Sequence, residues 1–162
     1  MALSDIREQI RTIIAGVSGI GVVHNYNRLP KDWSKFLDLF KDENDKINGV
    51  MFSRVGSTQR MYADTGLTTR THHFKFLVFY DIEDDKATSL TFQDTIIEGI
   101  VTAFDVSDSS KFTLNSSAFA IAPTGGGEMA GIQVDLIDDR TIGRISCHYA
   151  ELSLYVQSLE TA

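Results

Sequence analysis

The most regular pattern of apolar and polar positions lies in residues 69–81. The first half of this segment alternates, with Phe74 and Phe76 on one face and Lys75 on the other. The second half, residues 76–80, is apolar on both faces. Alternation predicts a strand with one solvated face, whereas a continuous apolar run predicts a strand covered on both faces. We therefore expect one strand that begins at an exposed edge and ends in the core.

This strand is expected to form a long β-hairpin with the segment before it. Residues 47–55 are strand-like, and Asp64-Thr65-Gly66 is typical of a turn. At about 3.3 Å per residue the 69–81 strand would span roughly 40 Å, close to the diameter of a domain of this length. Because residues 56–71 are mostly polar, we expect them to project as an arm, and residues 69–75 to leave the domain with it. The arm is either a surface loop or a contact to a neighbouring subunit.

Three segments carry apolar residues at helical spacing. The first follows Ser4, an expected N-cap, the second follows Pro30, and the third follows Thr88 or Ser89 as its N-cap. The apolar positions are Ile6, Ile10, Ile13, Ile14 and Val17 in the first segment, Trp33, Phe36, Leu37 and Phe40 in the second, and Leu90, Ile96, Ile97, Ile100, Val101 and Phe104 in the third.

The remaining strands complete an α+β pattern. Shorter strands are expected at residues 20–26, 112–122 and 132–137. The last strand, residues 147–159, alternates and has apolar residues at its even-numbered positions from 150 to 156. Since helices precede and separate strands that look hairpin-joined, we predict a single domain, residues 1–162, of the α/β sandwich type. One mixed, largely antiparallel sheet would carry the helices.

Charge and composition change this picture only in what they exclude. The net charge of −7 disfavours nucleic-acid binding, which requires clustered Lys and Arg. Acidic residues gather at residues 38–45, 81–85 and 135–139, and these are either solvated surface or a surface that repels a polyanion such as DNA. Cys147 is the only cysteine, which excludes an internal disulfide and favours a reducing compartment. Neither a membrane span nor a signal peptide is expected.

No pattern in the sequence indicates catalysis, a cofactor or a metal. In the glycine-rich segment 123–131 the glycines are followed by Glu128 rather than by the Lys of a phosphate-binding loop, so we expect a flexible loop there. The adjacent His72 and His73 would point to opposite faces of a strand. An alternative that stays open is a small metal-dependent enzyme in which His72 or His73 acts with Asp64.

Several short motifs resemble those of tail-terminator, or tail-completion, proteins of long-tailed bacteriophages. Residues 21–28 (Gly-Val-Val-His-Asn-Tyr-Asn-Arg) are similar to the strand that follows the first helix in that family. Residues 47–50 (Ile-Asn-Gly-Val) with Arg54, the Phe- and Ile-rich helix after a long hairpin, and a last strand beginning His148-x-Ala150 are similar as well. The chain departs from the pattern at Val50, where a Trp is expected, and residues 112–131 have no counterpart.

This resemblance implies a structural role. Such proteins form a ring, commonly of six subunits, on the head-proximal end of the tail tube. The ring stops polymerisation of the tube protein and offers a surface to head-completion proteins of the neck, while DNA passes through its lumen without being bound. The expected location is the virion, after assembly in the cytoplasm of the host bacterium. A second structural alternative is another neck component, such as a head-completion or connector protein.

On this hypothesis two sets of residues are candidates for a functional role. Arg60, Tyr62 and Arg70 on the hairpin arm are predicted to contact an adjacent subunit. The predicted acidic lining of the lumen is Glu83, Asp84, Asp85, Asp138 and Asp139.

Overall fold

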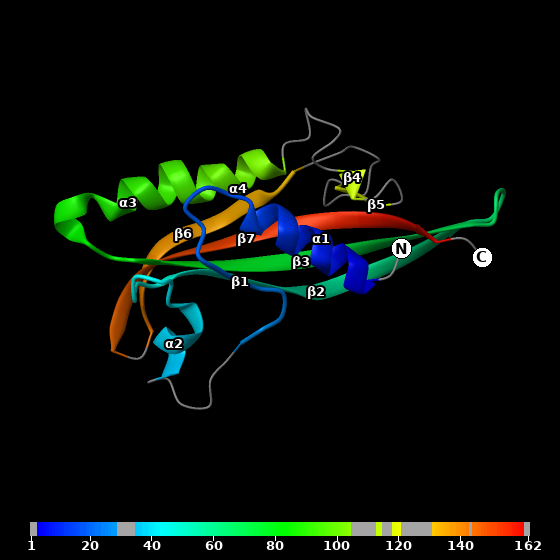
Figure 1. Cartoon of the computed structure of the whole chain (residues 1–162). Helices are drawn as coiled ribbons and strands as arrows, with labels where there is room; N and C mark the ends of the chain where they lie inside the picture. The colour runs from blue at the N-terminus through cyan, green and yellow to red at the C-terminus, as the bar shows by residue number, and fades with distance from the viewer. Residues whose placement is uncertain are drawn as a thin grey trace.

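The computed structural model of the chain describes residues 3–28, 35–104, 113–114, 118–120, 131–142 and 144–160. Its centre is a seven-stranded sheet. The strands are β1 (Val22–His24), β2 (Asn48–Tyr62), β3 (Leu67–Asp81), β4 (Thr113–Leu114), β5 (Ala118–Ala120), β6 (Gln133–Ile142) and β7 (Ile145–Glu160). Their order is β1-β2-β3-β7-β5-β4, with β6 also beside β7 (Figure 1). Among the described strands only the β1–β2 pair is parallel, so the sheet is mixed and largely antiparallel, as predicted.

Three long strands form the middle of the sheet. In the register of the sheet Phe52 of β2 lies opposite Phe76 of β3, which lies opposite Leu152 of β7. The far side of β7 pairs with β6 along its first half and with β5 near its end. Strands β2 and β6 each contain a bulge, which lies between Arg54 and Gly56 in β2 and between Val134 and Leu136 in β6.

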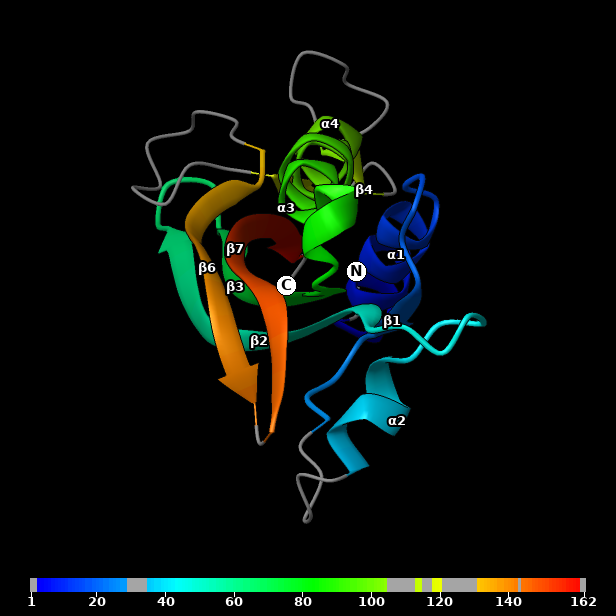
Figure 2. The same cartoon turned by 90° about the vertical axis from the view of Figure 1, so that its left-hand side faces the viewer.

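The helices lie on both faces of the sheet (Figure 2). Helix α1 (Leu3–Ala15) packs on one face beside a continuous helical rod. The rod consists of α3 (Thr88–Thr91), a π-helical segment (Phe92–Ile97) and α4 (Glu98–Ala103). The short helix α2 (Phe36–Phe40) lies against the opposite face. In the described part of the chain no helix is long and apolar enough to cross a membrane.

The main core lies between the sheet and α1, the π-helical segment and α4. From the strands it receives Val50, Phe52, Phe74, Phe76, Val78, Ala150, Leu152, Leu154 and Val156, and from the helices Ile6, Ile10, Ile14, Phe92, Ile96, Ile97, Ile100 and Phe104. Complete burial of side chains of this size stabilises the fold by roughly 1.5–3 kcal/mol each. The even-numbered positions of β7 face this core, which confirms the alternation predicted for the last strand.

A second, smaller cluster lies under α2 on the other face of the sheet. Phe36 and Phe40 of α2 contact Phe79, with ring centroids 5.2 and 4.8 Å apart. Cys147 and Tyr149 of β7 belong to the same cluster. Because β3 contributes Phe76 and Val78 to one face and Phe79 to the other, its second half is covered on both sides, as the apolar run predicted.

Several predictions of local detail are wrong. Helix α1 already includes Ser4, so Ser4 is not its N-cap. Ala87, in the left-handed conformation with φ 50°, precedes α3 in place of Thr88 or Ser89. Leu90 is 61% exposed rather than part of the apolar face. The wider turn of the π-helical segment, with its i→i+5 hydrogen bonds, displaces residues before it from the 3.6-residue spacing.

Some predictions fall where the structure gives no description. Trp33 lies outside the described residues, and so do residues 123–130 of the glycine-rich segment. Within the strand predicted at 112–122, only β4 and β5 are described. The short strand predicted at residues 20–26 is confirmed as β1.

Candidate functional site

The hairpin between β2 and β3 is the most prominent projection of the molecule (Figure 1). The two strands are joined by a tight turn in which the Gly66 amide donates to the Tyr62 carbonyl at 2.7 Å. Gly66 has φ 68°, a conformation that glycine adopts without steric cost. The turn signal Asp64-Thr65-Gly66 is thus confirmed.

The distal part of this hairpin is exposed on both of its faces. Every residue from 55 to 67 is exposed, and these include the apolar side chains of Val55, Met61 and Leu67. We call residues 55–67 the arm. The side chain of Met61 is 68% exposed, the most of any large apolar residue described. This part of the hairpin therefore buries neither face in its own domain.

Residues 69–75 do not leave the domain, contrary to the prediction. Thr69, His72 and Phe74 are buried, and β3 pairs with β7 from Thr68 opposite Glu160 onward. Because β7 is 16 residues long, it remains the hydrogen-bonded neighbour of β3 along this part of the strand. The arm is therefore shorter than the predicted residues 56–71.

The three predicted arm residues do not share one face. Arg60 lies opposite Thr69 and Tyr62 opposite Leu67, so Arg60 and Tyr62 point to the same side of the hairpin. Arg70 lies on the other side, where its guanidinium donates to Ser57 Oγ at 3.5 Å. Arg60 and Tyr62 are exposed, whereas Arg70 is only partly exposed.

The sheet has two long open edges in the part of the chain that the structure describes. Strand β1 pairs with β2 only at Gly49, Val50 and Met51, which leaves residues 52–62 without a partner on their outer side. We call this the β2 edge. On the opposite border β6 pairs with β7 alone, and nearly all of its residues are exposed. We call the outer side of Gln133–Ile142 the β6 edge.

The two edges differ in charge. The β2 edge carries Arg54 and Arg60 and no acidic residue. The β6 edge carries Asp135, Asp138 and Asp139 with one basic residue, Arg140. The sequence predicted roles for Arg60, Asp138 and Asp139 but did not predict the edges themselves, because strand order is a long-range property that periodicity does not encode.

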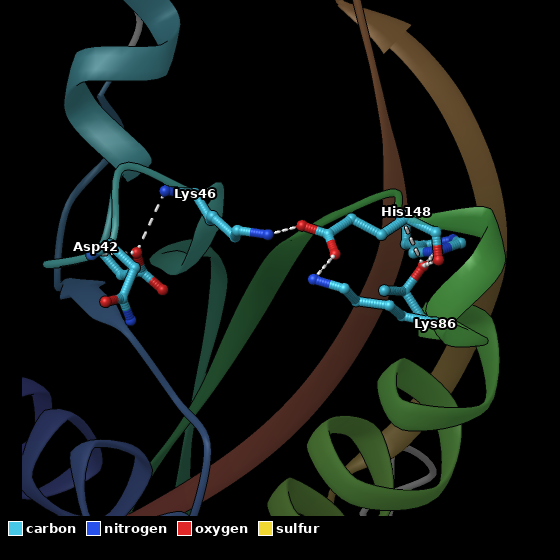
Figure 3. A network of polar contacts seen from close by, with 7 residues as sticks. Asp42, Lys46, Lys86 and His148 are labelled. Carbon is cyan, nitrogen blue, oxygen red and sulfur yellow. Dashed lines mark hydrogen bonds and ion pairs between the residues drawn. The ribbon is translucent and has the colours of Figure 1, made fainter.

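The predicted acidic residues gather at the end of the molecule away from the arm, where most of them have partners. Glu83 forms ion pairs with Lys46 and with Lys86, the latter at 2.8 Å (Figure 3). Asp138 lies 3.7 Å from Arg140. Asp85 is exposed, and the side chain of Asp84 lies outside the described part.

His148 joins the two predicted acidic groups. Its Nδ1 lies 2.6 Å from Asp139 Oδ1, and its Nε2 lies 2.9 Å from Thr88 Oγ1. Thr88 Oγ1 in turn accepts a hydrogen bond from the Glu83 amide at 2.9 Å. The imidazole stacks on Phe92 with ring centroids 5.6 Å apart. These contacts tie the loop after β3 to β6 and β7, a role for His148 that no local sequence signal indicated.

A cavity of about 300 Å³ lies beside this network. Its lining includes Asp42, Lys46, Asp81, Glu83 and Lys86. Asp42 Oδ1 accepts hydrogen bonds from the backbone amides of Asn44 and Lys46, at 2.8 and 3.1 Å, and these bonds close the turn before β2. Because Lys46 and Lys86 share this lining with the three carboxylates of Asp42, Asp81 and Glu83, the cavity presents no net positive charge to an anion.

The histidines of the metal-enzyme alternative are held in other contacts. His73 stacks on Tyr155 with ring centroids 4.3 Å apart, and desolvation by burial lowers the pKa of His73 despite the opposing effect of Asp135. His72 is buried on the other face, with its Nδ1 3.4 Å from an Arg54 nitrogen. Asp64 lies in the hairpin turn. Among the described residues no group of three or more His, Cys, Asp or Glu side chains is placed to hold a metal ion.

The face of the sheet around α2 contains three groups with displaced pKa values. Burial raises the pKa of the Cys147 thiol to about 11, and burial and then the neighbouring Glu151 raise that of Tyr149 to about 12. A hydrogen bond from Lys75 lowers the pKa of Glu151, and the two form an ion pair at 3.0 Å. All three shifts have a structural cause, and none of these groups lines the described cavity.

Comparison of this sequence with models of protein families and with curated proteins finds no match. The assignment of a function therefore depends on the motifs of the sequence and on the geometry of the arm and the two edges.

Proposed function

We propose that this chain is a structural protein of a bacteriophage tail that acts as a tail terminator. Copies of it assemble into a ring at the head-proximal end of the tail tube, stop the polymerisation of the tube protein and join the tail to the head. The observation that supports this most is the arm, residues 55–67, which is exposed on both faces and continues an open sheet edge.

A ring requires a contact between two different surfaces of each subunit. Such a head-to-tail contact closes into a ring when the rotation between neighbouring subunits divides a full turn. The arm and its open edge suit one half of this contact, because an unpaired strand gains hydrogen bonds when another strand is added to it. The motifs at residues 21–28 and 47–50, which form β1 and the start of β2, support the same family of proteins.

Passage of DNA through the ring is compatible with the charge of the chain. At a net charge of −7 the protein has too few Lys and Arg side chains, relative to its acidic ones, to neutralise DNA phosphates and release their counterions. The end opposite the arm gathers acidic residues, of which Asp85 is exposed. In the proposed ring this end borders the lumen, and DNA slides past it without being held. Cofactors and catalysis have no part in this role.

Deletion of the gene in the phage that encodes this chain tests the proposal. A terminator limits tail length, so its loss is expected to give overlong tails that lack heads. Normal-length free tails together with heads that leak DNA would contradict the proposal and favour a head-completion or connector protein instead. A deletion that changes neither tails nor heads would contradict both structural roles.

A further inference from the structure

The two open edges of the sheet have the properties of partners for each other. The β2 edge covers residues 52–62 and the β6 edge covers Gln133–Ile142, so the two are of similar length. Both carry exposed apolar side chains as well as charges: Val55 and Met61 at the first, and Val134 and Ile137 at the second. Exposed edges of this length are normally covered, shortened or paired with another strand.

The strand directions permit a continuous sheet across two copies. Each of the pairs β2–β3, β3–β7 and β7–β6 is antiparallel, so β6 runs antiparallel to β2 within one chain. Through Leu152 and Phe76, Val134 of β6 lies level with Phe52 of β2, so the rest of β6 lies level with the part of β2 before residue 52. A second copy in the same orientation, shifted along the strands until its β6 lies beside residues 52–62, therefore sets its β6 antiparallel to the β2 of the first. The alternation of strand directions then continues through the contact.

The charges distinguish this pairing from a symmetric one. Two β2 edges together would bring Arg54 and Arg60 of both copies into one strand pair, and two β6 edges would do the same with their three aspartates. Like charges opposite each other on neighbouring strands are destabilising, whereas opposite charges stabilise the pair. A β2 edge beside a β6 edge places arginines against aspartates.

We infer that the β2 edge of one copy pairs with the β6 edge of the next, so that the sheet continues from subunit to subunit. This inference rests on the proposed ring, because it names the two surfaces that form its repeated contact. It adds β6 as the partner of the arm. Each of the two edge strands contains one bulge, which increases the local right-handed twist of that strand.

Two variants with altered charge test this pairing. The first combines Thr58→Glu with Arg60→Glu and makes the β2 edge acidic. The second combines Gln133→Lys with Asp138→Lys and makes the β6 edge basic. All four residues are exposed, and circular dichroism is expected to show that both variants fold. Asp135 and Asp139 are left unchanged, because they contact Ser153 and His148 in the same chain.

Assembly is measured by light scattering of wild type, each variant and their equimolar mixture. Each variant alone opposes like charges in every contact, so we expect its midpoint concentration for assembly to rise by about tenfold or more. In the mixture the acidic β2 edge of the first variant meets the basic β6 edge of the second, and the wild-type β2 edge of the second meets the wild-type β6 edge of the first, so assembly is expected to return. A second variant that assembles like wild type, or a mixture in which assembly stays lost, would overturn the inference.

A cross-linking experiment provides an independent measurement. Thr58→Cys combined with Ile137→Cys is expected to give chains of covalently linked subunits with a short bifunctional maleimide, whereas Thr58→Cys alone is expected to stay uncrosslinked. Linkage by Thr58→Cys alone would indicate a symmetric contact between β2 edges and would overturn the inference. If wild type forms rings but neither test supports the pairing, only the inference fails. If wild type forms no assembly at any concentration, the proposed ring fails as well.

Discussion

Glu151 and Lys75 form an ion pair on neighbouring strands, at the border of the cluster under α2. Hydrogen bonding from Lys75 lowers the pKa of Glu151 below its ordinary value of 4.5. A carboxyl group whose pKa is lowered in the folded state stabilises the protein above its unfolded pKa, and this stabilisation is lost as the pH falls through the folded value. The side chains of Lys75 and Glu151 are 41% and 22% exposed, so solvent screening limits the effect.

Replacing Glu151 by Gln is therefore expected to reduce the dependence of stability on pH. Between pH 7 and pH 3 the free energy of unfolding of wild type should fall more than that of Glu151→Gln, by up to about 1 kcal/mol. Urea unfolding at a series of pH values measures this. Glu8→Gln is the control, since the Glu8–Arg11 pair lies about half exposed on α1. Equal pH dependence of wild type and Glu151→Gln would show that the Lys75–Glu151 bond does not persist in solution.

Cys147 is fully buried, and its thiol has a pKa of about 11. Because the thiolate is the reactive form, we expect Cys147 to resist a thiol reagent at pH 8 in the folded protein and to react at once after denaturation. The rate of labelling with a chromogenic disulfide, with and without denaturant, checks this prediction. Rapid labelling of the native protein would mean that the cluster under α2 is open.

At the residue scale the sequence predicted contacts only where neighbours follow from local periodicity. The inward positions of β7 and the apolar stripe of α1 were predicted because alternation and helical spacing specify which side chains share a face. The contacts of His148 with Asp139 and Thr88 were not, because Thr88 lies 60 residues away in the sequence and only the fold brings the two together.

At the scale of single elements, the packing of α2 on β2 depends on a residue without a side chain. A Cβ added at Gly49 would lie 2.7 Å from Phe40 Cδ1. Gly49→Ala is therefore expected to destabilise the fold by about 1–3 kcal/mol through overpacking. Gly56→Ala on the same strand is the matched control, because its nearest contact would be 3.9 Å away and we expect a change within about 0.5 kcal/mol. Chemical denaturation measures both, and equal stability of the two variants would contradict this placement of α2.

The arm allows assembly and folding to be separated. Arg60 and Tyr62 are exposed, so Arg60→Ala with Tyr62→Ala is expected to weaken assembly and to change the free energy of unfolding of the monomer by less than about 0.5 kcal/mol. Arg70→Ala is expected to affect folding more, because Arg70 is partly buried and bonded to Ser57. Gel filtration and urea unfolding measure the two effects. Rings of undiminished stability in the double variant would remove the arm from the contact.

The length of the arm shows what limits prediction of an element from its own sequence. A polar stretch within a strand indicates that it lacks apolar cover, but whether it leaves the domain depends on the length of the strand beside it. Thr69 and His72 were predicted to project and are instead buried next to β7. The hairpin and its turn were predicted correctly because both are specified by residues close in the sequence.

At the scale of the whole molecule, the arm projects from one end and the acidic residues gather at the other. The two long open edges, the β2 edge and the β6 edge, lie on opposite borders of the sheet. The fold class was predictable, since helices and hairpin-joined strands alternate in a pattern typical of α+β domains. The order of the strands was not, and the two open edges follow from that order. The proposal of a ring therefore gains its second contact surface, the β6 edge, only from the structure.

The mass of the assembled protein tests the proposed ring. Six chains of 18.0 kDa would give a closed ring of roughly 108 kDa, and light scattering after gel filtration measures it. High salt is expected to weaken the ring, because the proposed contact brings opposite charges together near the surface. A species whose mass grows without limit as concentration rises would indicate an open filament rather than a ring.

We propose that this chain ends the growth of a tail tube, and polymerisation of the tube protein in vitro tests this proposal. Tube protein of the same phage is polymerised with and without this chain, and tube lengths are measured in electron micrographs. We predict that added chain shortens the tubes in proportion to its amount and appears as a ring at one tube end. Tubes of unchanged length, with no particle at either end, would contradict the account.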